Sequence, residues 1–195
     1  MGARNKQKAE NITYYSVMDG KFITKVDKGT EGSVTRKNKK GKTVTEMQFE
    51  EIFGKITNVK VKEHEEFGKR LIINLIDNEG AEDQIEMPLS SSYAFGFLNR
   101  IANPALDLSK EVSLKVYDIE DKEKEGKIKK HFVIYQNGQK IENHYTKENP
   151  NGLPELVETQ DEKKPYDDTA RNEFFEKYIS TELAAKISTA STVTP

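Results

Sequence analysis

The central part of the chain alternates apolar and polar residues with the two-residue period of half-buried β-strands. Five such runs lie at residues 54–62, 69–77, 84–89, 112–119 and 131–136. In the second run, Leu71, Ile73 and Leu75 share one face. We therefore expect five strands, each with one buried face.

A helix is predicted between the third and fourth strands. Ser90-Ser91-Ser92 offers N-caps, Tyr93, Phe97 and Ile101 follow at helical spacing, and Pro104 ends the segment. The order of three strands, a helix and two strands is that of a mainly β, five-stranded OB-type barrel. Such barrels bind ligands with loops that here correspond to residues 63–68 and 121–130. An open sheet or a sandwich fragment is compatible with the same order.

Further elements are predicted before and after this barrel in the sequence. Short β-like runs at 13–17 and 21–26 precede a basic β-hairpin around Gly41, and an amphipathic helix is expected at 169–187. We expect the apolar face of this helix to pack either on the barrel or on a partner protein. The predicted division is a disordered basic tail (1–12), an OB domain with its N-terminal hairpin (13–148), an acidic linker (149–168), the helix (169–187) and a polar tail (188–195).

Composition narrows the functional classes. Apolar residues make up 34% and charged residues 33%, which predicts a modest core beneath a densely charged surface. The absence of cysteine excludes disulfides, zinc knuckles and thiol nucleophiles. No apolar run approaches the roughly 18 residues that span a bilayer, and the N-terminus lacks a signal-like apolar stretch. We therefore expect a cytoplasmic protein with no membrane partner.

The charge is unevenly distributed although the net charge is only −2. Residues 1–45 carry eleven Lys/Arg against four Asp/Glu, whereas residues 153–195 carry five against nine. This asymmetry is typical of nucleic-acid-binding proteins, although chance segregation in a charge-rich chain gives the same pattern.

Catalytic and metal-binding patterns are missing from the sequence. His64, His131 and His144 are scattered, and no nucleophile or phosphate-loop motif occurs. The acidic clusters alternate with lysines, as solvated loops do. We expect no enzymatic activity, no catalytic residues, no metal and no cofactor.

Single-stranded nucleic acid binds where cations meet phosphates and aromatic rings stack on bases. Candidates on the first two strands and their loop are Lys60, Lys62, Phe67, Lys69 and Arg70. Candidates on the last two strands and their loop are Lys115, Tyr117, Lys127, Lys129 and Tyr135. The hairpin tip adds Arg36, Lys37, Lys39 and Lys40.

Each group of candidates has a structural alternative. The hairpin tip is either a solvated turn or an arm that clamps the phosphate backbone. Phe67 could fold back onto the barrel rim instead of stacking on a base. Tyr117 and Tyr135 could pack beneath the C-terminal helix.

The basic hairpin followed by GKITNVKVKE, FGKRLIINLID, IEMPLSSSYAFGFLNRI and DLSKEVSLKVYD resembles small single-stranded DNA-binding proteins of bacteriophages. The resemblance covers about residues 20–145. It implies an OB barrel that coats single strands, with Lys60, Lys62, Phe67, Lys69, Arg70 and Tyr117 among the contact residues. It also implies an acidic C-terminal tail that recruits partner enzymes. The tail here, STASTVTP, is neutral and departs from that pattern, although the acidic 155–168 segment could substitute.

The leading hypothesis is a sequence-tolerant single-stranded DNA-binding protein of phage replication or recombination, with RNA as a variant ligand. Its expected location is the cytoplasm of a bacterial host. Replication or recombination proteins and further copies of the chain are the expected protein partners. The rival hypothesis is a phage or bacterial structural or adaptor protein that uses the barrel and helix for protein contacts.

Overall fold

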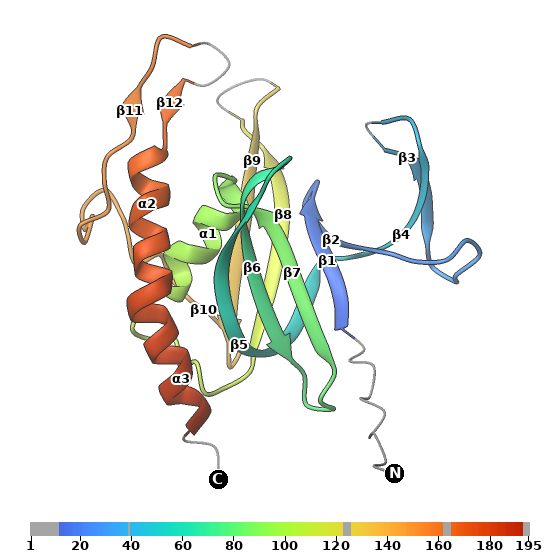
Figure 1. Ribbon diagram of the computed structural model, residues 1–195, viewed down its shortest axis with the longest axis horizontal. Helices are drawn as coiled ribbons and strands as arrows, with labels where there is room; N and C mark the ends of the chain where they lie inside the picture. The colour runs from blue at the N-terminus through green and yellow to red at the C-terminus, as the bar shows by residue number, and fades with distance from the viewer. Residues whose placement is uncertain (1–11, 39, 123–125, 162–164, 193–195) are drawn as a thin grey trace, which may run out of the picture.

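The computed structural model describes residues 12–38, 40–122, 126–161 and 165–192. The fold is built on one strongly bent, mixed β-sheet of ten strands, with helices covering one side (Figure 1). The strand order is β10-β9-β8-β5-β6-β7-β1-β2-β4-β3. The strands are β1 (Ile12–Met18), β2 (Lys21–Lys25), β3 (Val34–Lys37), β4 (Thr43–Phe49), β5 (Glu51–His64), β6 (Gly68–Ile76), β7 (Glu82–Pro88), β8 (Val112–Glu120), β9 (Ile128–Gln136) and β10 (Gln139–Lys140).

The predicted five-stranded OB barrel is wrong. The expected strands and helix occur in the expected order as β5, β6, β7, α1 (Ser92–Ile101), β8 and β9, but they do not close on themselves. The edge of β7 is instead occupied by β1, which runs parallel to it with Ile12 opposite Glu82 and Ser16 opposite Glu86. The N-terminal runs, predicted to be an appendage, thus satisfy the backbone groups of β7 and extend the sheet through β2, β4 and β3.

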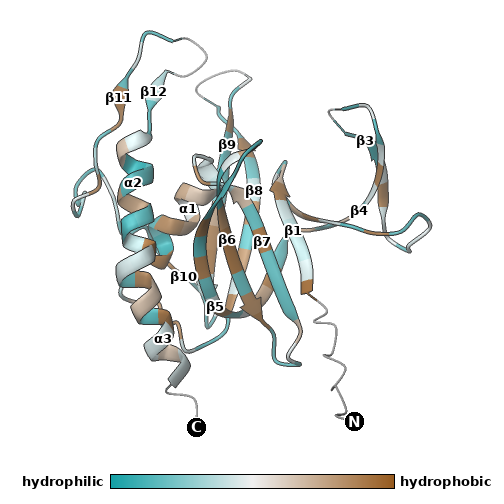
Figure 2. Ribbon diagram, viewed as in Figure 1, coloured by the Kyte–Doolittle hydropathy of each residue, from teal (hydrophilic) through white to brown (hydrophobic). Residues whose placement is uncertain are grey.

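The core lies between the bent sheet and α1. Figure 2 shows apolar and polar bands alternating along the central strands, as expected when one strand face is buried. Leu71, Ile73 and Leu75 of β6 are almost completely buried. The Phe132 ring of β9 lies in edge-to-face contact with Phe22 of β2 and Phe97 of α1, with centroids 5.8 and 5.3 Å away. These contacts join β2, α1 and β9 in one core.

The turn between β1 and β2 is fixed against β8. The backbone N–H of Gly20 donates to the Tyr93 hydroxyl at 2.8 Å, and that hydroxyl donates to Asp118. Gly20 has φ +69°, and a Cβ atom there would lie 2.8 Å from the backbone nitrogen of Asp118. Glycine is therefore required both by the backbone angle and by the close approach of the two chain segments.

The C-terminal helix packs on the protein's own sheet, which resolves the alternative left open by its apolar stripe. It comprises α2 (Thr169–Tyr178), a π-helical turn η1 (Ile179–Leu183) and α3 (Ala184–Thr192), and thus continues beyond the predicted end. Phe175 contacts both Phe95 of α1 and Tyr145. The buried side chains of the stripe are Phe175, Tyr178, Ile179, Leu183 and Ile187.

The segment predicted as an acidic linker contains a short two-stranded hairpin, β11 (Val157–Glu158) with β12 (Tyr166–Asp167). Residues 1–11 of the predicted tail and Lys39 of the hairpin tip lie outside the described residues. None of the helices in the described part of the chain has the length and apolarity needed to cross a membrane.

Candidate nucleic-acid interface

A groove of about 650 Å³ lies across the neighbouring strands β6, β7, β1 and β2. We call it the β1–β6 groove, lined among others by Tyr14, Ser16, Lys25, Arg70, Gln84 and Glu86. The parallel pairing places Tyr14 opposite Gln84 and Ser16 opposite Glu86, on the face away from the core residue Ile85. The Tyr14 side chain is 59% exposed. The groove therefore combines an accessible aromatic ring with cations from two other strands.

Lys60 and Lys62 extend this face from the neighbouring strand β5. They are opposite Ile72 and Arg70 of β6, and they alternate with the core residue Val59. Both lysines are exposed, and neither forms an ion pair with a described residue. Their positive charge is therefore not compensated locally, unlike that of Arg70, whose Nε lies 2.9 Å from Glu86 Oε1.

Phe67 occupies the turn between β5 and β6. Its side chain is 56% exposed, and its ring lies 4.8 Å from the His64 ring, centroid to centroid. The ring therefore contacts His64 of the same turn and leaves more than half of the side chain accessible. The neighbouring Lys69 is engaged by α2, because its Nζ lies 2.6 Å from Glu176 Oε1.

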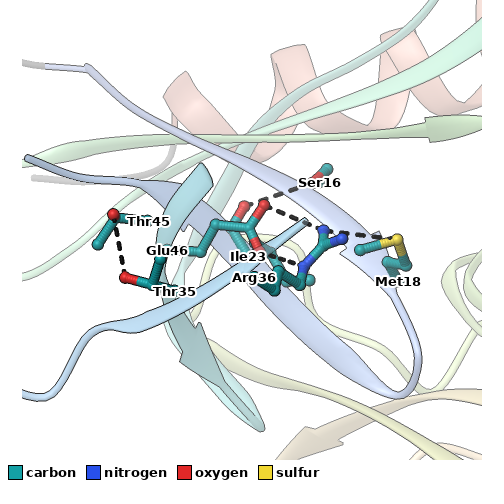
Figure 3. Close-up of polar contacts among 7 residues, drawn as sticks. All are labelled: Ser16, Met18, Ile23, Thr35, Arg36, Thr45 and Glu46. Carbon is teal, nitrogen blue, oxygen red and sulfur yellow. Dashed lines mark hydrogen bonds and ion pairs between the residues drawn. The ribbon is translucent and has the colours of Figure 1, made fainter. Parts of the chain in front are cut away.

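The basic hairpin forms an arm, residues 26–45, that leaves the sheet at β2 (Figure 1). Arg36 holds it in place: Nε and Nη2 donate to the buried Glu46 carboxylate at 2.7 and 3.1 Å, and Nη2 also lies 3.9 Å from Met18 Sδ (Figure 3). Of the predicted arm residues, Arg36 is therefore engaged by Glu46 within the protein, whereas the Lys37 side chain is exposed to solvent.

The arm tip also meets the β5–β6 turn. Lys40 Nζ lies 3.5 Å from Glu66 Oε1, the residue before Phe67. The structure thus brings together two groups of candidates that the sequence placed in separate elements. Together with the β1–β6 groove they form one extended outer surface.

The remaining candidates lie on a second surface, the β8–β9 face. Tyr117 stacks on His131 with centroids 5.0 Å apart, and Lys115 Nζ lies 5.4 Å from the centre of the Tyr135 ring. Burial, and next the nearby Arg100 guanidinium, lower the pKa of His131. Neither tyrosine packs in the manner of the predicted alternative, since their ring partners are strand residues rather than the C-terminal helix.

Carboxylates already neutralise many of the predicted cations. The ion pairs are Arg36–Glu46, Lys40–Glu66, Lys69–Glu176, Arg70–Glu86, Lys115–Glu51 and Lys129–Asp121. Among the described candidates, those without an ion pair to a described residue are Lys37, Lys60, Lys62 and Lys127. Two of these four lie side by side on β5, next to the β1–β6 groove.

Two groove residues, Tyr14 and Lys25, were missed by sequence reasoning. The Tyr14-Tyr15 pair in a β-like run was a usable signal, because alternation must place one ring on each face. The structure bears this out: Tyr15 packs towards the core with its ring 5.9 Å from Phe49, while Tyr14 faces outward.

No group of three His, Asp or Glu side chains in the described ranges is arranged to hold a metal ion. The chain matches no protein-family model, no curated protein and no solved structure. The inference of function therefore depends on the geometry and charge of the two surfaces.

Proposed function

We propose that the protein binds single-stranded DNA with little sequence preference along the surface formed by β5, the β1–β6 groove and the arm. The observation that carries this proposal is the pairing of uncompensated cations with exposed aromatic rings on one face. Lys60 and Lys62 supply the charge, and Tyr14 and Phe67 supply the rings. RNA is a variant ligand of the same chemistry.

The energetics of single-strand binding fit this surface. Stacking of a base on an aromatic side chain contributes about 1–3 kcal/mol and tolerates any base, because every base has a π-face. Lysine contacts to phosphate carry no sequence information but fix the path of the backbone. In the groove wall, Arg70 and Glu86 are already bound to each other, so this pair is not free to read base edges.

The proposed biological setting is coating of single strands during phage replication or recombination. The rival proposal of a structural or adaptor protein relied partly on a free apolar helix stripe. That stripe is buried against the sheet and α1, with Phe175 and Leu183 almost inaccessible. The rival therefore loses one of the two surfaces that it used, the apolar helix stripe.

The proposal is tested by fluorescence anisotropy with labelled oligo-dT over a salt series. We expect binding that weakens as salt rises, and Lys60→Gln/Lys62→Gln to reduce the slope of log affinity against log salt by about 1.4, or about 0.7 per lost phosphate contact. Lys147→Gln/Lys186→Gln is the matched control, since it removes two exposed lysines that belong neither to the arm nor to the strands of the proposed surface.

Absence of binding at low salt would overturn the proposal. So would an equal slope for the β5 variant and the control variant. A blunt duplex of the same length distinguishes single-strand preference from general polyanion binding, because the exposed aromatic rings can stack only on unpaired bases.

A further inference from the structure

Two oppositely charged elements lie at the two ends of the molecule's longest axis (Figure 1). One is the arm, which carries six Lys/Arg against two Asp/Glu in residues 26–45. The other is the segment 155–168 that contains β11 and β12, here called the C-terminal hairpin, which carries six Asp/Glu against two Lys. The elements are too far apart to meet within one chain, but a second copy displaced along this axis would place them together.

Both elements expose apolar side chains beside their charges. Val157 and Tyr166 of the C-terminal hairpin are 64% and 47% exposed, and Val34 of the arm is 47% exposed. Each element therefore offers a small apolar contact beside its charges.

Both elements also have open strand edges. β3 is the last strand of the ten-stranded sheet and pairs only with β4. β11 and β12 pair only with each other. Unpaired backbone donors and acceptors at such edges favour pairing with a strand of another chain.

The charged residues nearest these edges are available for contacts between copies. Lys28 and Lys37 of the arm and Glu155 and Glu158 of the C-terminal hairpin are exposed. None of the four forms an ion pair with another described residue. Their charges are opposite, so the two elements attract each other, whereas two arms or two C-terminal hairpins repel.

We propose that the arm of one copy binds the C-terminal hairpin of a second copy, through Val34 against Val157 and through lysines against glutamates. Because the two surfaces differ and lie at opposite ends, copies that share one orientation along the long axis join head-to-tail and form an open row of molecules. The contact is small and charged, so it is weak and sensitive to salt. This inference goes beyond the proposed function and does not require nucleic acid.

The absence of cysteine from the sequence makes a decisive cross-linking test available. Val34→Cys and Val157→Cys proteins are prepared separately and treated with a short bis-maleimide, without nucleic acid and at low salt. We expect each protein alone to give no cross-linked dimer, an equal mixture to give cross-linked dimers only, and the Val34→Cys/Val157→Cys protein to give a ladder of longer cross-linked products. Glu79→Cys, at the exposed β6–β7 turn, replaces Val34→Cys as the matched control.

Charge-reversal variants test whether arm lysines attract the glutamates of the C-terminal hairpin. Lys28→Glu/Lys37→Glu in the Val34→Cys protein should lower the dimer yield several-fold, and Glu155→Lys/Glu158→Lys in the Val157→Cys partner should restore it. Circular dichroism confirms that each variant is folded.

The inference is overturned if the mixture cross-links no better than the Glu79→Cys control. It is also overturned if Val34→Cys alone cross-links equally well, or if charge reversal leaves the yield unchanged. Because no oligonucleotide is present, these outcomes are independent of the test of single-stranded DNA binding.

Discussion

Lys69 of β6 and Glu176 of α2 are joined by an ion pair of 2.6 Å, although 107 residues separate them in the chain. Hydrogen bonding to the Glu176 carboxylate raises the pKa of Lys69 above its ordinary value. The pair lies beside the exposed Phe67, at the end of the proposed DNA-binding surface. α2 therefore places a carboxylate where a phosphate would otherwise contact this lysine.

Glu176→Gln should increase affinity for oligo-dT, because it releases Lys69 for phosphate contact. We expect a severalfold tighter complex and a salt slope steeper by about 0.7, the value of one added phosphate contact. Anisotropy over a salt series measures both. Glu182→Gln, which removes a carboxylate farther along the same helix, should leave affinity unchanged; equal effects of the two substitutions would show that only net charge matters.

Tyr14→Ala should weaken DNA binding without affecting stability. The ring is largely exposed, so its removal forfeits little packing, while loss of one stacked base costs about 1–3 kcal/mol, or roughly 5- to 150-fold in affinity. Tyr14→Phe keeps the stacking face and should bind like the unmodified protein. Tyr166→Ala, which removes an exposed tyrosine of the C-terminal hairpin, is the matched control. Both variants are measured on an oligonucleotide that is long enough to bind only one protein molecule. A Tyr14→Ala protein that binds normally would remove the groove from the proposed site.

Arg36 should prove to be a structural residue rather than a phosphate ligand. Arg36→Met leaves the buried Glu46 carboxylate without its partner, and breaking such a pair costs about 3–5 kcal/mol. Hydrogen exchange of β3 and β4, together with urea denaturation, measures the loss. Arg36→Met/Glu46→Gln removes the charge as well and should recover much of the stability. If both proteins retain normal protection of the arm, the ion pair does not anchor it.

The His131 pKa makes stability depend on pH in a defined direction. The folded-state pKa is lowered, mainly by burial and next by the Arg100 guanidinium, although Asp118 opposes this. Protonation of His131 therefore favours the unfolded chain. The contribution of the neutral side chain to folding stability is fully present above the unfolded-state pKa of about 6.5, and it is lost as pH falls through that value towards the lower folded-state pKa. The melting temperature should fall between pH 7.5 and pH 5, and it should fall less in the His131→Phe protein. An identical pH profile would exclude this histidine as the cause.

Local patterns predicted the individual elements well, because the cause of each is local. The alternation of Leu71, Ile73 and Leu75 follows directly from one buried strand face, and the helix at Tyr93–Ile101 from its spacing and serine cap. The prediction that was wrong is the closure of the five strands into a barrel. The edge of β7 is paired by β1, about 70 residues earlier in the chain, and periodicity contains no information about which distant strand satisfies an edge.

The same limit applies to the candidate site. Residue type indicated where cations and aromatic rings occur, but not which cations are already paired. Glu46 and Glu176 bind Arg36 and Lys69 only because the fold brings them together. Lys60 and Lys62 are identified as two of the four candidate cations without an ion pair to a described residue only after those partners are known.

Gly20→Ala should strongly destabilise the protein, because two separate costs combine at this turn. An alanine at φ +69° costs about 1–2 kcal/mol, and its Cβ would also lie 2.8 Å from the Asp118 backbone nitrogen. The β1–β2 turn would then have to move off β8, and the hydrogen bond from Gly20 to Tyr93 would be lost.

Gly29→Ala separates these two costs. Gly29 has φ +92°, but no atom lies within 4 Å of its added Cβ, so the substitution imposes backbone strain without a clash. Urea denaturation should therefore show a loss for Gly20→Ala that exceeds the loss for Gly29→Ala by at least about 1 kcal/mol, the cost of an unmade buried hydrogen bond. Equal losses would mean that the β1–β2 turn does not dock on β8.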